Sequence, residues 1–508
     1  MERRSRDERW RETALTTFDV AIVGGGINGA CLYHQLCERG YRVLLVDRGD
    51  FACGTSQASA MMAWGGLLYL RNLDFKAVWE FSAARDAMIA DMPGRVERRS
   101  FRYIPAARDG RSKHLVHAAL YLYWLVGRLR QHRPRLEKRF AEEELLRADM
   151  RGPNSLLYEE GVLSFSDSRF VLQWISPHGN AGQVALNYGR LAGGEFCRRE
   201  RLWHLDLEDE LGDRNVSARA RCVVNCAGVW TDEVNRSFGI HSPIRHAFSK
   251  GVFIGFERHP EHRVPLIFDA GEHGDAISFI PWGPVALWGP TETAVQSPEE
   301  GCRMVDEDVD FLLRHARRLL NGKFDAKHIV SLRCGVRPLP IESDCSEEVH
   351  PMKLSRRHRV VVDANRPWIS TYGGKITGCA LLARQLEGHI KRMAAPTGEV
   401  RGGESLDAAI GAWGTFPGLE ERVPALDWCM EREYCCTLED YMRRRTNIAQ
   451  WVAREGLGKE DENGPFLYQL ALQLSDGDPL RAERQIETYR EQVHARFDQL
   501  TGRVYHDY

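Results

Sequence analysis

Three glycines near the N-terminus have the spacing of a dinucleotide-binding turn. Gly24, Gly26 and Gly29 match the pattern G-x-G-x-x-G and directly follow a short apolar run. In such a turn the first glycine permits a tight bend, the second lets a pyrophosphate approach the backbone, and the third allows a helix to pack closely on a strand. Asp47, 23 residues after Gly24, ends a second apolar run, where a carboxylate can accept hydrogen bonds from a ribose. An acid at this position fits FAD or NAD and disfavours NADP.

The glycines and Asp47 can act together only if a strand, a helix and a second strand position them. Apolar runs at 18–23 and 42–46 predict the two strands, and the apolar period of 30–38, closed by Gly40, predicts the helix between them. The N-terminus of that helix offers amide donors and the positive end of its dipole to a phosphate. The sequence therefore predicts a βαβ unit that binds a dinucleotide.

Length and changes of pattern predict more than one domain. A chain of 508 residues exceeds what a single hydrophobic core usually holds. We expect residues 1–16 to form a flexible extension, and 17–395 to form an α/β, Rossmann-like dinucleotide-binding domain. An α+β substrate domain with a mixed or antiparallel sheet, roughly 75–160 and 240–345, is interleaved with it. A small α-helical C-terminal domain, 401–508, follows a linker rich in glycine and proline and serves as a cap or an oligomer contact. The further elements expected are strands at 184–188, 222–226, 252–256, 277–280, 285–288, 359–363 and 368–372, and helices at 380–393, 437–454 and 480–499.

Several segments beyond the glycine turn also have distinctive sequences. The turn itself lies in DVAIVGGGINGA (19–30), and the motifs that follow are GTSQAS (54–59), GGLLYL (65–70), FIPW (279–282), GPTE (289–292), GVRPL (335–339), Ser355-Arg356 with His358, GGKIT (373–377) and TLEDYMRRRT (437–446). Together they resemble the FAD-dependent glycerol-3-phosphate dehydrogenases, which belong to the D-amino-acid-oxidase-like flavoproteins. Because the likeness covers nearly the whole chain, it implies FAD as the cofactor.

The resemblance implies which residues meet the flavin. Gly374, Ile376 and Thr377 would direct backbone amides toward the N1/O2 side of the ring, where negative charge grows on reduction. Gly65, Gly66 and Leu67 would pass under the isoalloxazine. The remaining cofactor contacts implied are Gly24, Gly26, Ile27, Asn28, Gly29, Asp47, Thr55, Ser56, Ser59, Val184, Gly228 and Lys375.

A cluster of cations is implied at the substrate. Arg337, Arg356 and Lys375 fall on family positions that hold the substrate anion, and Tyr69 falls on another site position. Arginine suits this work because its planar fork grips phosphate or carboxylate through paired hydrogen bonds. These four residues are the candidate catalytic set for a small anionic substrate.

Four positions depart from the family pattern. Leu68 replaces an arginine, Trp64 a histidine, Met61 a lysine and Phe253 a histidine. Loss of one cation from a dianion clamp weakens phosphate binding by about 1.5–3 kcal/mol. Trp64 and Phe253 would add apolar volume near the site. We therefore hypothesise a substrate with a single carboxylate or a differently placed phosphate on a larger or more apolar body, rather than glycerol 3-phosphate itself.

The implied reaction is hydride transfer from a carbon that bears oxygen, or less readily nitrogen, to flavin N5. Lys375 or a bound water would replace the missing histidine as base, and the electrons would pass to a quinone or to O2. One alternative is an amino-acid or amine oxidase in which Arg337 binds a substrate carboxylate. Another is an FAD-binding partner protein whose active site has decayed.

Charge and composition limit the partners. The formal net charge of -2 argues against bulk electrostatic binding of nucleic acid. The 13 cysteines lack metal-ligand or redox spacing, so we expect no metal site and a cytoplasmic protein with reduced thiols. An apolar segment at 115–126, followed by a basic stretch, predicts either a core-facing helix or an interfacial helix in peripheral contact with the inner membrane face.

Overall fold

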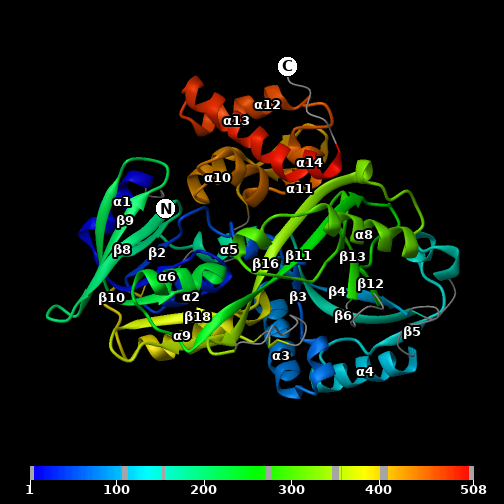
Figure 1. The fold of residues 1–508 in the computed structure, drawn as a ribbon, viewed down its shortest axis with the longest axis horizontal. Coiled ribbons are helices and arrows are strands. Elements are labelled where there is room, and N and C mark those ends of the chain that lie inside the picture. Colours follow the sequence, from blue (N-terminus) through cyan, green and yellow to red (C-terminus); the bar gives the residue numbers. More distant parts are fainter. Residues whose placement is uncertain are drawn as a thin grey trace.

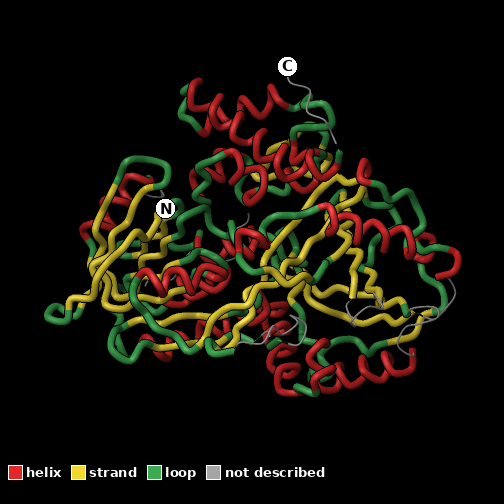
Figure 2. Tube along the Cα trace, viewed as in Figure 1, coloured by secondary structure: helices red, strands yellow, loops and turns green. Residues whose placement is uncertain are grey.

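The computed structural model of the chain describes residues 5–105, 113–150, 155–269, 276–345, 354–355, 357–400 and 410–502. Within these ranges two large sheets contact one another, and helices surround them (Figures 1 and 2). The helices α10 to α14 gather at one end of the molecule, and α3 and α4 lie at the opposite end (Figure 1). The α/β fold with a helical C-terminal region is the fold expected from the sequence.

The first sheet has a parallel centre. Its main path runs β17-β18-β10-β1-β2-β7, and β1 pairs in parallel with both β10 and β2. The apolar side chains of β1 alternate between two core clusters, one shared with α2 and α9 and the other with Trp10 and Trp203. Burial on both faces explains the near-continuous apolar run at 18–23. The strands are β1 (Thr17–Val23), β2 (Val43–Val46), β7 (Gln183–Leu186), β8 (Gly189–Cys197), β9 (Leu202–Asp209), β10 (Asn215–Asn225), β17 (Arg359–Val362) and β18 (Trp368–Tyr372).

The second sheet is mostly antiparallel. Its main path runs β15-β11-β14-β13-β12-β4-β6-β3, with β16 paired along β11 and β5 along β6. Its strands alternate along the chain with those of the first sheet, as the expected interleaving requires, while the division into domains stays a prediction. The strands are β3 (Met62–Ala63), β4 (Val96–Ile104), β5 (Arg135–Glu137), β6 (Ser155–Leu163), β11 (Ile244–Glu257), β12 (Leu266–Asp269), β13 (Ala276–Trp282), β14 (Val285–Gly289), β15 (Thr293–Val295) and β16 (Ile329–Glu342).

The helices pack around and beyond the sheets. The C-terminal region also contains a hairpin of β19 (Trp413–Phe416) and β20 (Leu419–Pro424), which the sequence did not predict. The helix expected at 437–454 is broken into short pieces around a π-helical segment, Asp440–Arg445. The α-helices are α1 (Arg6–Leu15), α2 (Ile27–Glu38), α3 (Phe75–Asp91), α4 (Lys113–Val126), α5 (Asp167–Ile175), α6 (Thr231–Ser237), α7 (Pro298–Gly301), α8 (Asp306–Leu319), α9 (Cys379–Ile390), α10 (Leu426–Arg432), α11 (Ile448–Trp451), α12 (Gly464–Leu474), α13 (Pro479–Val493) and α14 (Gln499–Thr501).

The N-terminal segment differs from the flexible extension expected. Helix α1 begins with a capping box between Ser5 and Glu8, and Trp10 is only 2% exposed in the core of the first sheet. Arg6 donates to the buried carboxylate of Asp209 at 2.5 Å. The alternating charges of this segment suggest a solvated chain. In the structure they flank the buried ring of Trp10, and the ion pair of Arg6 with Asp209 holds the helix in place.

Helix α4 contains the apolar segment 115–126, for which the sequence left a core-facing and an interfacial helix open, and it has both a buried and an exposed apolar side. Leu120 and Tyr123 are buried, whereas Leu115, Leu122 and Leu125 are exposed. No helix in the described part of the chain has the length and hydropathy needed to cross a membrane. Peripheral membrane contact through α4 stays a prediction.

One buried carboxylate joins the C-terminal region to the first sheet. Asp50, in the loop after β2, receives two hydrogen bonds from Arg445 at 2.5 and 2.8 Å and one from Arg444 at 2.6 Å. These three side chains are at most 3% exposed. The two guanidinium groups hold the pKa of Asp50 at about 2, against the opposing effect of its burial. These hydrogen bonds therefore attach the C-terminal region to the loop that follows Asp47.

We predict that Asp50→Asn lowers the free energy of unfolding by about 3–5 kcal/mol, because it removes the carboxylate that pairs with the fully buried guanidinium of Arg445, whereas Arg444 keeps Asp440 at 2.7 Å. Chemical denaturation followed by circular dichroism measures the change. Asp325→Asn, which removes a carboxylate about half exposed and paired with Arg317, is the matched control and should cost less than about 1 kcal/mol. Equal losses in the two variants would contradict the prediction.

Candidate active site

The glycine turn lies between β1 and α2, where the backbone leaves no room for side chains. Gly24 has φ +102°, and a Cβ there would lie 2.5 Å from the carbonyl oxygen of Cys226 at the end of β10. A Cβ on Gly29 would lie 1.9 Å from the carbonyl oxygen of Gly24. The first and third glycines of the motif are thus required by the fold, and the turn has the geometry that a pyrophosphate site needs.

The N-terminus of α2 has features that fit a phosphate. Gly26 supplies no capping side chain, and the first turn contains no acidic residue. Ser56 accepts a hydrogen bond from the Ile27 amide at 3.0 Å, so its hydroxyl lies at the helix terminus, as a phosphate neighbour would. Asn28 donates to the carbonyl of Gly373 at 3.0 Å, and its buried Oδ1 has no hydrogen-bond partner among the described residues. That oxygen fits a donor supplied by a bound cofactor.

Asp47 lies at the end of β2, beside the same turn. Its carboxylate accepts hydrogen bonds from the amides of Gly25 at 2.6 Å and Gly49 at 2.9 Å. Burial nevertheless raises the pKa of Asp47 to about 6. A ribose hydroxyl that donated to this carboxylate would favour its charged form, so the site fits the adenosine half of FAD.

A second glycine turn connects β18 to α9. Gly374 has φ +108°, and a Cβ there would lie 2.7 Å from Nδ2 of Asn28, so the turn is held against the start of α2. Ile376 and Thr377 are buried in the single 3-10 turn that leads into α9. Amides at a helix start carry partial positive charge, which suits the side of a flavin where negative charge grows.

The loop Gly65–Leu67 is braced by a buried polar cluster that sequence reasoning missed. Glu160 accepts hydrogen bonds from the Gly65 amide at 3.0 Å, from Arg85 at 2.9 Å and from the Tyr123 hydroxyl at 2.6 Å. Burial raises the pKa of Glu160 against the effect of Arg85. Glu160 follows Glu159 in β6, a strand buried at every position except Glu159, so no alternation in the sequence indicates which of the two acids points inward.

The other predicted cofactor residues have diverse surroundings. The Thr55 hydroxyl donates to the carbonyl of Val336 at 2.6 Å, and the Ser59 hydroxyl donates to Asp167 at 2.8 Å, so both are engaged with the second sheet and its flank. Val184 is fully buried within β7, which leaves only its backbone for a ligand. Gly228 has open space around its α-carbon. The contacts of all four with FAD stay predictions.

Two of the candidate cations contact side chains that change the electrostatic field around them. The Lys375 ammonium donates to the Tyr69 hydroxyl at 2.8 Å and lies 4.4 and 5.1 Å from the ring centres of Tyr69 and Phe81. The Arg337 guanidinium lies 3.2 Å from the carboxylate of Glu292. Arg337 is in β16, where it pairs with Ser249 of β11. Lys375 and Tyr69 are therefore brought together, whereas Arg356 lies outside the described residues.

The four departures from the family pattern have different environments. Trp64 and Leu68 are half-buried on either side of the Gly65–Leu67 loop, where they can add apolar surface to a site. Met61 is 1% exposed, and Phe253 is 2% exposed in β11, where it packs against Gly289. Phe253 packs in the core cluster that also contains Met61 and Ile376, and its contribution to the apolar wall of the site stays a prediction.

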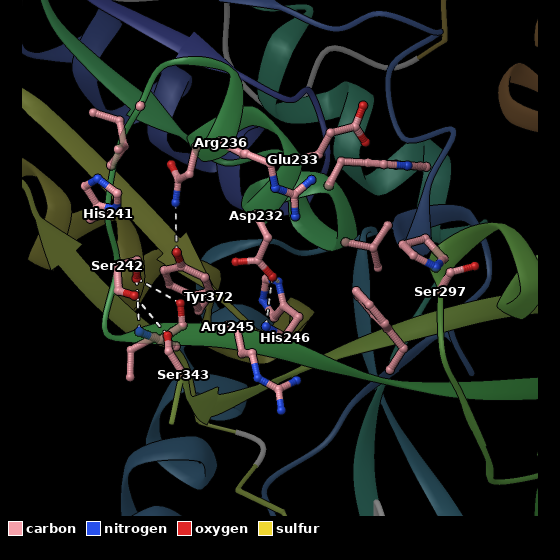
Figure 3. A pocket seen from close by; sticks show the side chains of 18 of the residues that line it. Asp232, Glu233, Arg236, His241, Ser242, Arg245, His246, Ser297, Ser343 and Tyr372 are labelled. Atoms are coloured by element: carbon pink, nitrogen blue, oxygen red, sulfur yellow. Dashed lines mark hydrogen bonds and ion pairs between the residues drawn. The ribbon is translucent and has the colours of Figure 1, made fainter. Parts of the chain in front are cut away.

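A pocket of about 660 Å³ is lined by residues of α6, β11 and Tyr372, the residue that precedes the second glycine turn (Figure 3). None of the predicted flavin residues lines it. On its wall Asp232 lies beside His246 (Figure 3) and accepts a hydrogen bond from the His246 amide at 2.9 Å. The His246 Nε2 in turn accepts a hydrogen bond from the Gly373 amide at 3.1 Å. Burial lowers the pKa of His246 to about 3, so the ring stays neutral and supports the turn.

Comparisons with known proteins agree with this geometry. The model of the FAD dependent oxidoreductase family matches residues 19–377. The chain is 29% identical over 381 residues to the glycerol-3-phosphate dehydrogenase of Pseudomonas aeruginosa, covering 72% of this chain and 70% of that protein. It is 26% identical over 380 residues to the aerobic glycerol-3-phosphate dehydrogenase of Escherichia coli, covering 73% and 72%. The solved glycerol-3-phosphate dehydrogenase of Bacillus halodurans, complexed with FAD, superposes with a TM-score of 0.70 at 19% identity and 99% coverage of both chains.

We predict that FAD affinity rises as the pH increases toward 6 and is constant above it. Ribose hydroxyls that donate to Asp47 favour its ionised form, so binding lowers a pKa of about 6 in the free protein and is strongest where Asp47 is already ionised. Titration of apoprotein with FAD, followed by flavin fluorescence between pH 4.5 and 8, measures the slope. Asp47→Asn should bind FAD more weakly and with no such slope; a slope that persists in this variant would rule out Asp47 as its source.

Proposed function

The chain belongs to the family of FAD dependent oxidoreductases, and on that premise we propose that it oxidises a small anionic alcohol other than glycerol 3-phosphate. Bound FAD would supply a hydride acceptor at N5, with a quinone or O2 as the final acceptor of the electrons. The protein's own residues then have three tasks: they bind the anion, orient the carbon and direct the departing proton.

The ion pair of Arg337 with Glu292 carries the proposal about the substrate. Glu292 is 8% exposed at its side chain and also accepts a hydrogen bond from Ser249 at 2.6 Å, so it is fixed beside the guanidinium. A carboxylate at 3.2 Å cancels much of the field that a dianion would experience. With Leu68 in place of a family arginine, this supports a substrate that carries one negative charge, or a phosphate placed away from Arg337.

Lys375 and Tyr69 would act as a unit on the substrate. The faces of Tyr69 and Phe81 stabilise an ammonium rather than a neutral amine, which supports Lys375 as a cation that attracts the substrate anion. The Tyr69 hydroxyl accepts the Lys375 hydrogen bond, and a hydroxyl that accepts one bond can also donate, so Tyr69 would serve as a donor to a substrate oxygen. A bound water then replaces Lys375 as the favoured base.

Two other functions remain open to test. An amino-acid or amine oxidase would use the same cations for a substrate carboxylate, with nitrogen in place of oxygen on the oxidised carbon. An FAD-binding partner protein would retain the cofactor site without turnover. The intact pairing of Lys375 with Tyr69 favours a working site over a decayed one.

We predict that a carboxylated alcohol reduces the flavin at least ~10-fold faster than glycerol 3-phosphate, the ratio expected when one charged contact to phosphate is missing. The measurement is anaerobic bleaching of the oxidised flavin band across phosphorylated and carboxylated alcohols and amines. Fastest reduction by glycerol 3-phosphate would overturn the substrate proposal. Fastest reduction by an amine would favour the oxidase, and complete inertness would favour the partner protein.

We predict that Glu292→Gln increases the affinity for phosphorylated alcohols by roughly tenfold. Without the carboxylate, Arg337 can bind the phosphate, and the gain is about that of one charged hydrogen bond. The apparent Kd comes from the concentration dependence of anaerobic flavin reduction. Glu342→Gln, which removes an exposed partner of Arg359 at the end of β16, is the matched control and should change nothing. Unchanged or weaker phosphate binding in Glu292→Gln would show that Glu292 does not compete with the substrate.

A further inference from the structure

Three side chains with metal-ligating atoms converge between α2 and the segment that follows α5. His34 and Glu38 lie one turn apart on α2, and His178 lies three residues beyond the end of α5. One ligand atom from each lies within 4.8 Å of the other two. Residues four apart on a helix share a face, so the pair on α2 is set by local structure and only His178 must be brought by packing.

The distances are close to those of a tetrahedral centre. His178 Nε2 lies 2.7 Å from His34 Nδ1 and 3.9 Å from Glu38 Oε1. Ligand atoms bound to Zn²⁺ at about 2.0–2.1 Å in a tetrahedron lie roughly 3.3 Å apart. One distance is shorter than this and the other longer, so small side-chain rotations would reach the required geometry.

The surroundings prepare the two imidazoles as ligands. His178 is fully buried at its side chain, and His34 packs edge-on against Trp174 with ring centres 5.1 Å apart, so both rings are held in place. The negative charge of Glu38 would attract a metal cation, whereas the positive charge of Arg95, which also acts at His34, would repel it. The Glu38 side chain is 39% exposed, so solvent can reach the cluster from its side.

We propose that His34, Glu38 and His178 bind a divalent zinc ion, with water as the fourth ligand. Two imidazoles and a carboxylate form a donor set that suits Zn²⁺ better than Mg²⁺ or Ca²⁺, which prefer oxygen ligands. The ion would cross-link α2 to the chain after α5 and so stabilise the helix whose N-terminus forms the cofactor turn. This site is separate from the proposed oxidation and does not depend on it.

The contrasting interpretation is a histidine pair held only by its own hydrogen bond, with Glu38 as a neighbour. The sequence alone favours that view, because the spacing of His34 and Glu38 is common on solvated helices. The two interpretations differ in one measurable property, which is whether Zn²⁺ binds the folded holoprotein at this cluster.

The test uses FAD-loaded protein treated with a chelator and then titrated with Zn²⁺ by calorimetry. We expect binding of one ion, a higher Tm and reversal by chelator, since a ligand of the folded state stabilises it. Glu38→Gln and His34→Gln should each weaken binding by at least about tenfold, the order of loss seen at perturbed metal sites. Co²⁺ in place of Zn²⁺ should absorb at wavelengths longer than the oxidised flavin band, and this absorption should disappear in both variants.

His204→Gln is the matched control, because His204 and Glu200 form a similar pair, 2.9 Å apart and four residues apart, without a second imidazole. It should bind Zn²⁺ as the unaltered protein does. The flavin spectrum and the metal-free Tm verify that each variant is folded. Absence of binding to the unaltered protein, unchanged binding in either α2 variant, or loss of binding in His204→Gln would overturn the proposal.

Discussion

The buried carboxylate of Asp50 is the contact on which the joining of the C-terminal region to the first sheet depends. Buried charges are costly unless each has its partner, and here one carboxylate pairs with two guanidinium groups from the C-terminal region, one of which, Arg444, also pairs with Asp440. Asp50 also lies three residues after Asp47, in the loop that the cofactor site requires. The C-terminal region is therefore part of the wall that supports the dinucleotide turn, as well as a cover over one end of the molecule.

Similar buried pairs determine the character of the active site. Glu160 accepts a hydrogen bond from the Gly65 amide and so fixes that loop. Glu292 holds the Arg337 side chain and offsets its positive field. The first pair makes the loop rigid, and on the proposed function the second would favour an anion of lower charge. In that proposal neighbouring carboxylates adjust the specificity of a site whose cofactor residues follow the family pattern.

Sequence reasoning succeeded where the determinants are local. The glycine turn, β1, α2 and β2 follow from spacing and apolar period within thirty residues, and the later motifs gave the family and its cofactor. It failed where the partner is distant. Helix α1 is held by a buried ring and by Asp209, which lies 203 residues beyond Arg6 along the chain. Glu160 and Glu292 could not be placed, because a charged residue in a strand does not reveal its partner.

The separation of Asp50 from Arg444, 394 positions along the chain, has a consequence for synthesis on the ribosome. At roughly 5–20 residues per second, the loop after β2 waits about 20–80 s before its guanidinium partners emerge. During that interval a nascent chain carries a carboxylate that cannot yet be buried at low cost. Completion of the cofactor domain is therefore expected to be one of the last events of translation, and prematurely terminated chains should be recognised as unfolded and degraded.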